Sequence, residues 1–235
     1  AAVAPYVFVN PPTGHANGYI SLKGSRDVDM HFDLDGGPFE WWKFRVPNIR
    51  GHAHWMGDSL VLTNMQMQFY EGWAEGSAYF DFAPPVGTDF AFTLNSTNAN
   101  LHLLLADLYS PTNTLEGQLS GTIAVTNANT SVDGSWNGFG HAELRDGLIW
   151  SIPVFGVLSK PLNALVPGLG NSRITEAKTW FTITNSLIHS GDLEMRTPTT
   201  RLQYSGTVDF AGKVNARVEA ELFRDTWLIG RVVSI

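Results

Sequence analysis

Apolar and polar residues alternate along most of this chain with a period of two. In the clearest run, from Lys213 to Leu222, valine, alanine and leucine occupy every second position, and charged residues or asparagine lie between them. Successive side chains of a β-strand point to opposite faces, so this run predicts a strand with one apolar and one solvated face. The alternation recurs in 28–34, 78–82, 90–94, 115–125 and 202–210. Strands that are solvated on one face are typical of antiparallel sheets.

Two segments have helical spacing instead. Four leucines between 101 and 108 follow the i, i+3, i+4, i+7 pattern and predict a short helix over 98–109. Asn98 and Asn100 are candidates for its N-terminal cap, and Ser110-Pro111 is expected to end it. Val154, Leu158, Leu162 and Leu165 are also spaced as on one face of a helix, and they predict a helical segment over 153–166. Two short helices cannot cover a sheet built from this many strands.

These patterns predict a mainly β protein, with an elongated, curled antiparallel sheet and two short helices. Its apolar concave face would stay open as a groove for acyl chains. The alternative is a β-sandwich, in which a second sheet covers that face with protein. The residues expected to line the groove and contact lipid are Met30, Phe32, Leu34, Phe80, Phe82, Phe90, Phe92, Leu94, Leu119, Ile123, Tyr204, Val208, Phe210, Val214, Val218 and Leu222.

The composition narrows the classes of partner. Apolar residues make up 43% of the chain and charged residues 16%, with 23 Gly and 12 Pro, which indicates a folded protein rich in turns. The net charge is −7 and the 15 Lys and Arg are scattered, so nucleic acid is not expected as a partner. The longest apolar region, 148–166, is interrupted by Ser, Pro, Lys and Asn and does not predict a membrane span. We therefore expect any membrane anchor to lie outside this sequence.

Candidate metal chemistry is limited to histidines and carboxylates, because the chain has no cysteine. His52 and His54 are two residues apart on a predicted strand and would share a face, with His31 or Asp58 as further ligands. Sequence places no third ligand, and two surface histidines are the commoner outcome. We therefore predict no metal site.

Catalytic patterns are also weak. Glycoside hydrolysis requires two carboxylates at a set distance from each other. Glu71 with Glu75 and Asp81 with Asp89 are candidate pairs, but the sequence does not fix the distance between their carboxylates. There is no Gly-x-Ser-x-Gly turn and no glycine-rich phosphate loop. We expect no catalytic residues, no cofactor and no enzyme activity.

Eight tryptophans offer a different function. Aromatic rings can stack on sugars, so a β-sandwich that binds carbohydrate is an alternative to the groove. The residues considered for this platform are Trp41, Trp42, Trp55, Trp73 and Trp136. Core and rim aromatic residues of a β protein are the preferred interpretation.

The second half of the chain has a characteristic order of short motifs. In sequence they are Leu115 to Gly121, Gly138-Phe139-Gly140, Leu144 to Ile149, Ile152 to Gly156, Phe181-Thr182-Ile183, Asn185 to Ile188, Asp192-Leu193, Gly206 to Phe210 and Gly212-Lys213-Val214. This order resembles the C-terminal region of the AsmA-like, TamB-related family. The resemblance spans 115–235, and 1–114 looks like upstream strands of the same family. In one departure, Asn185-Ser186 stands where family members often have Asn-Gly.

The resemblance implies an elongated β-groove that conducts phospholipids between the inner and outer membranes of diderm bacteria. It implies a periplasmic protein anchored in the inner membrane through a segment outside this sequence. Expected partners are phospholipid acyl chains, further strands of a longer protein, and membrane proteins. Headgroup phosphates would lie at the groove rim near Arg201, Arg217 or Lys213. An outer-membrane assembly or interaction module is the family-based alternative.

Overall fold

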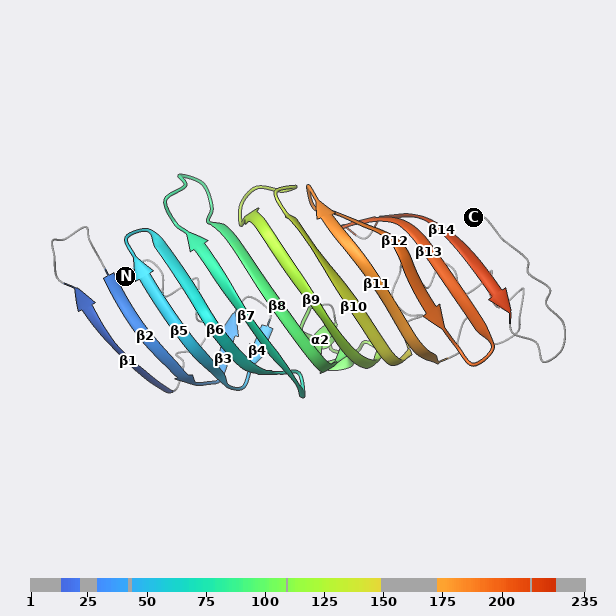
Figure 1. Ribbon diagram of the computed structural model, residues 1–235, viewed down its shortest axis with the longest axis horizontal. Coiled ribbons are helices and arrows are strands. Elements are labelled where there is room, and N and C mark those ends of the chain that lie inside the picture. Colours follow the sequence, from blue (N-terminus) through green and yellow to red (C-terminus); the bar gives the residue numbers. More distant parts are fainter. Residues whose placement is uncertain are drawn as a thin grey trace.

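One large sheet dominates the computed structural model, which describes residues 14–21, 29–41, 44–108, 110–148, 173–211 and 213–222. Figure 1 shows twelve strands side by side in one antiparallel sheet. In sheet order they are β1 (Gly14–Ser21), β2 (Asp29–Gly36), β5 (Ile49–Met56), β6 (Ser59–Phe69), β7 (Gly72–Asp81), β8 (Asp89–Asn100), β9 (Glu116–Asn129), β10 (Asn137–Leu148), β11 (Ile174–Thr184), β12 (Leu187–Arg196), β13 (Thr200–Asp209) and β14 (Val214–Leu222). A separate hairpin joins β3 (Phe39–Trp41) to β4 (Phe44–Val46).

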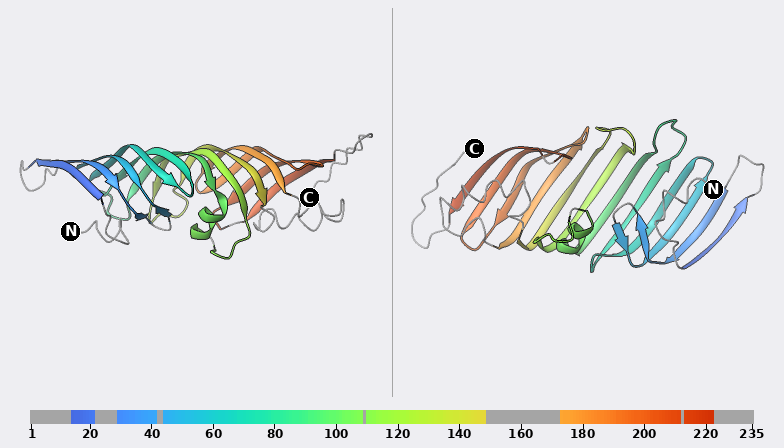
Figure 2. Two further views of the ribbon diagram at one scale, coloured as in Figure 1. Left: turned by 90° about the horizontal axis from the view of Figure 1, so that it is seen from below. Right: turned by 180° about the vertical axis from the view of Figure 1, so that it is seen from behind.

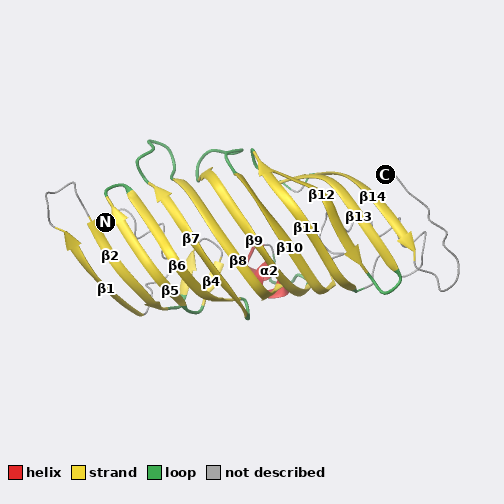
Figure 3. Cartoon of the chain, in the orientation of Figure 1, coloured by secondary structure: helices red, strands yellow, loops and turns green. Residues whose placement is uncertain are grey.

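The sheet is an open meander in which each strand pairs with its neighbours in the chain, apart from the inserted hairpin. Strands β1 and β14 form its two edges. The curled, groove-like sheet confirms the predicted fold class, and strands account for most of the described residues (Figure 3). No second large sheet lies among the residues described, so the β-sandwich alternative is wrong for this part of the chain.

A single row of paired residues crosses all twelve strands. Directly paired residues of an antiparallel sheet share a face, so the row defines one face of the whole sheet. This central row consists of Gly18, Phe32, Ala53, Leu62, Ala78, Phe92, Val125, Gly138, Ile183, Ile188, Val208 and Val214. Every member is apolar or glycine. We call this side the apolar face and the opposite side the polar face.

Bulges keep apolar residues on this face while bending the strands. In β6 the pairing with β7 shifts between Leu62 and Met65, around Asn64, whose φ is 52°. In β8 the pairing with β9 shifts between Ser96 and Ala99. An extra residue in one strand bends it and increases its twist. In the edge view of Figure 2 (left) the strands bow, and the one described helix lies inside the bow.

Helix α2 (Leu101–Leu108) follows β8 directly. The side chain of Asn100 accepts a hydrogen bond of 3.3 Å from the backbone N–H of Leu103, which confirms Asn100 as the cap. The predicted start at 98 is wrong, because β8 continues to Asn100. The predicted helical segment 153–166 lies outside the described residues. Among the residues described, no helix has the length and apolar character to span a membrane.

The predicted division at residue 114 falls inside this sheet. Strand β9 begins at Glu116 and pairs with β8 over most of its length. The two predicted regions therefore share one sheet. Their division into 1–114 and 115–235 stays a prediction.

Glycines on the apolar face allow close approach of neighbouring strands. A Cβ built on Gly138 would lie 2.2 Å from the carbonyl oxygen of Ala124. Real Cβ atoms do not approach backbone this closely, so a side chain here would push β10 away from β9. Glycines of this kind are one way in which a curved sheet is built.

We predict that Gly138→Ala destabilises the protein by about 1–3 kcal/mol, the usual cost of overpacking. Gly191→Ala is the matched control, because a Cβ at Gly191 would meet nothing within 4 Å. Urea unfolding followed by circular dichroism measures both. Equal midpoints for the two variants would contradict the close approach of β9 and β10.

Candidate functional site

The apolar face is the candidate site, and its densest packing lies towards β14. A second row of paired residues crosses this part of the sheet, from β8 to β14: Ala99, Leu119, Leu144, Ala177, Met195, Leu202 and Ala220. Met195 and Leu202 are completely inaccessible to solvent, and Tyr204 and Val218 belong to the same core cluster. Burial raises the pKa of the Tyr204 hydroxyl, so it stays protonated.

Aromatic rings cluster on the apolar face towards the other end of the strands. Trp136 meets Phe90 edge-on at 5.1 Å between ring centroids and Phe210 edge-on at 5.5 Å. Phe90 also stacks on Phe92 at 6.4 Å. Edge-to-face contacts of this kind add stability beyond the burial of area. The sequence suggested Trp136 only for a sugar-stacking platform and did not place it on the apolar face, because it follows a turn and no alternating pattern includes it.

Most residues predicted to line the groove share the apolar face with the central row. Two of them lie outside the strands. Phe210 lies in the turn after β13, not in a strand, and its side chain is 52% exposed. Phe82 follows the end of β7, but its ring stacks on Trp55 at 5.5 Å and so joins this face. The backbone of Leu222 pairs with Thr200 at the end of β14, and the Leu222 side chain lies outside the described part.

Described residues outside the strands pack on the apolar face at both ends of the strands: helix α2 at one end, and Trp136 at the other, where it packs against the buried cluster of Phe90 and Val125. Leu101 and Leu104 of α2 bury their side chains among the core clusters of the sheet. The hairpin β3–β4 lies beside α2 and β6. Phe32, Phe92 and Val208 of the central row are half-buried, and no second large sheet lies among the described residues to cover them.

A polar link of three residues connects α2 with the hairpin β3–β4 and the end of β6. Arg45 of β4 forms a two-pronged ion pair with Asp107 of α2, with a distance of 2.9 Å from Nε to Oδ2. The hydroxyl of Tyr70, at the end of β6, donates a hydrogen bond of 2.9 Å to the same Oδ2 atom. Burial is the main cause that raises the pKa of Tyr70 to about 12, so its hydroxyl remains a donor at neutral pH. The hydrogen bond from Arg45 lowers the pKa of Asp107.

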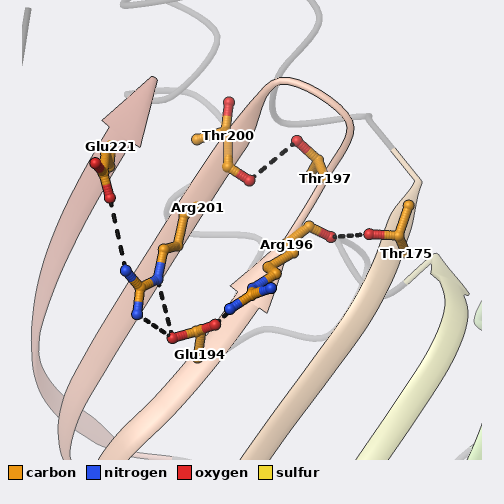
Figure 4. Close-up of polar contacts among 7 residues, drawn as sticks. All are labelled: Thr175, Glu194, Arg196, Thr197, Thr200, Arg201 and Glu221. Atoms are coloured by element: carbon orange, nitrogen blue, oxygen red, sulfur yellow. Dashed lines mark hydrogen bonds and ion pairs between the residues drawn. The ribbon is translucent and has the colours of Figure 1, made fainter. Parts of the chain in front are cut away.

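The polar face carries paired charges (Figure 4). Glu194 of β12 accepts hydrogen bonds from Arg196 at 2.6 Å and from Arg201 at 2.9 Å, and Arg201 also pairs with Glu221 at 3.7 Å. The Glu194 side chain is 11% exposed. The hydrogen bond from Arg201 is the main cause that lowers the pKa of Glu194. The carboxylate is therefore ionised and satisfied.

This pairing corrects the proposed rim role of two arginines. Arg201 and Arg217 both lie on the polar face, opposite the groove, and Arg217 pairs with Glu219 at 2.8 Å. A shallow hollow on the same face is lined by charged and aromatic residues of β10 to β14, including Glu143, Lys178, Trp180, Asp192, Arg217 and Glu219. Its mixed charge does not suit an acyl chain.

Comparison with protein-family models, characterised proteins and solved structures finds no match to this chain. The resemblance of 115–235 to AsmA-like proteins therefore stays a prediction. The geometry of the face carries the functional argument.

The tryptophans do not form one platform among the described residues. Trp55 and Trp136 lie on the apolar face with phenylalanines. Trp73 and Trp180 lie on the polar face, on β7 and β11, and are 48% and 65% exposed. The side chains of Trp41 and Trp42 lie outside the described part. A row of sugar-stacking rings is not supported.

The histidines share a face as predicted, and the structure gives each histidine and acid its own partners. His52 and His54 share the polar face of β5 but have different partners: His52 contacts Asp33 at 2.5 Å and His54 contacts Asp29 at 2.8 Å. Asp81 and Asp89 are directly paired across β7 and β8, and each accepts a hydrogen bond from a neighbouring N–H group. Glu71 and Glu75 accept from Asn100 and Asn95 respectively.

We predict that Asp107→Ala lowers the free energy of unfolding by about 1–2 kcal/mol, because it removes three hydrogen bonds to a charged acceptor but leaves Arg45 solvated. The Arg45 side chain is 67% exposed. The pKa of Asp107 is lowered in the folded state, so its contribution is complete above the unfolded pKa of about 3.9 and is lost as pH falls through the lower folded pKa. Urea unfolding at pH 7 and near pH 3 measures this.

Asp133→Ala serves as the control, because Asp133 is exposed in a turn. It should leave the unfolding midpoint nearly unchanged at both pH values. A difference between wild type and Asp107→Ala that stays constant or grows at low pH would contradict the link.

Proposed function

We propose that this chain is a non-enzymatic module that binds and conducts the acyl chains of phospholipids along its apolar face. The observation that carries the proposal is the central row, which crosses all twelve strands without a polar residue. Eleven spacings of about 4.8 Å give the row a length of roughly 50 Å across the strands. That exceeds the hydrocarbon thickness of a bilayer, about 30 Å.

The energetics favour a conduit over a tight binding site. Moving an acyl chain of about sixteen carbons from a membrane into water costs roughly 12 kcal/mol, at about 0.8 kcal/mol per CH₂ group. A continuous apolar face removes most of that barrier by replacing water with hydrocarbon contact. It needs no strong attraction, because the lipid lies in an apolar phase at either end of the path. Alternating side chains provide this surface without any catalytic group.

The sheet edges support a place in a longer assembly. Strands β1 and β14 each have one unpaired side among the described residues. Open strand edges pair readily with further strands. We therefore propose that further strands extend the groove beyond these edges, and, from the resemblance of 115–235, that the protein acts in the periplasm between two membranes.

Lipid contact can be tested with single cysteines, because the natural chain has none. Ile188 lies in the central row, whereas Leu187 is its aliphatic neighbour on the polar face and is 42% exposed. Each is replaced by cysteine, labelled with a benzophenone maleimide and irradiated with phosphatidylethanolamine vesicles. Mass spectrometry should find at least about tenfold more lipid adduct at position 188 than at position 187.

Circular dichroism controls for the fold of each labelled variant. Equal adduct at both positions, or none at position 188, would contradict lipid contact on the apolar face. A protein cross-linked at position 188 in place of lipid would favour the assembly-module alternative.

A further inference from the structure

Three side chains with metal-binding atoms meet on the polar face, near the β1 edge of the sheet. His31 of β2 is paired directly with His54 of β5, so their imidazoles lie side by side. Asp29 lies two residues before His31 on the same strand and therefore on the same face. Because the group lies opposite the proposed groove, nothing about it depends on lipid binding.

The donor atoms of the three residues converge. Asp29 Oδ1 lies 3.0 Å from His31 Nε2 and 2.8 Å from His54 Nε2. All three donor atoms lie within 4.8 Å of one another. The two rings stack with 3.8 Å between centroids and 19° between planes, and the Nε2 atoms of both rings lie within 3.0 Å of the same carboxylate oxygen.

These separations are compatible with a metal ion shared by the three side chains. Zinc binds histidine nitrogen and carboxylate oxygen at about 2.0–2.2 Å, which places tetrahedral ligands about 3.3 Å apart. A single divalent ion replaces both Nε2 protons and keeps the carboxylate neutralised. The side chains are 37–40% exposed, so water has access to the remaining coordination position.

We propose that Asp29, His31 and His54 form a site for a divalent zinc ion on the polar face. Two imidazoles and one carboxylate suit zinc and neighbouring first-row metals, whereas magnesium prefers an all-oxygen shell. The ion would connect β2 and β5 through their side chains. It would thereby stabilise the pairing of these two strands close to the sheet edge.

His52 provides a control within the same strand. It lies on the same face as His54 but contacts Asp33 at 2.5 Å and is not a member of the converging group. Removing its imidazole changes the histidine content of this surface equally while leaving the three proposed ligands in place. Its direct partner across the strands is Asp33, whereas that of His54 is His31.

The experiment is titration of the EDTA-treated full chain with ZnCl₂ by isothermal calorimetry, together with thermal unfolding with and without ZnCl₂. We expect one zinc ion per chain and a higher melting temperature with zinc, because an ion bound only by the native state stabilises it. His31→Ala, His54→Ala and the isosteric Asp29→Asn should each weaken binding at least about tenfold and abolish the thermal shift. His52→Ala should retain affinity within about twofold.

Circular dichroism without metal shows whether each variant is folded, so loss of binding is read only from folded protein. Absence of zinc binding by the wild-type chain would overturn the site. Equal losses for His52→Ala and His54→Ala would also overturn it, as would binding of MgCl₂ as tight as that of ZnCl₂.

Discussion

The rest of this structure depends on cross-strand register. Pairing each strand with the next fixes which residues share a face, and a shift of one residue would move every apolar side chain of a strand into water. The central row keeps its register across all twelve strands. Where the strands must bend, the added residue sits in a bulge. In β6, Leu62 precedes the bulge and Met65 follows it, and both still lie on the apolar face.

An apolar face of this length needs a cover in water. Side chains in the central row bury part of their surface against lateral neighbours, but α2 and the hairpin β3–β4 lie only at one end of the strands. The link of Arg45, Tyr70 and Asp107 holds that cover in place with directional contacts. At the other end, Trp136 packs edge-on against Phe90 and Phe210. Elsewhere the face offers the non-directional contact that hydrocarbon can use.

Sequence predicted the parts that follow from local periodicity. Alternation in β14 and β2 assigned faces correctly, and four leucine positions indicated α2. Contacts between residues distant in the chain could not be predicted. Trp136 reaches Phe210 across 74 positions because β10 to β13 fold side by side. Likewise, the sequence named His31 and Asp58 as alternative further ligands beside His52 and His54, and only the strand register shows that His31 stacks on His54.

The separation of the two faces would let one sheet combine the proposed lipid path with polar sites. Neighbouring residues in a strand point in opposite directions, so Glu194 and Met195 experience opposite environments although they are adjacent in the chain. Glu194 binds two arginines, while Met195 is completely buried. A change on the polar face can therefore alter ion pairs or metal ligands without placing a charge against lipid. By the same reasoning, a polar residue in the central row would interrupt the hydrocarbon path at its own strand, because every strand contributes one position to it.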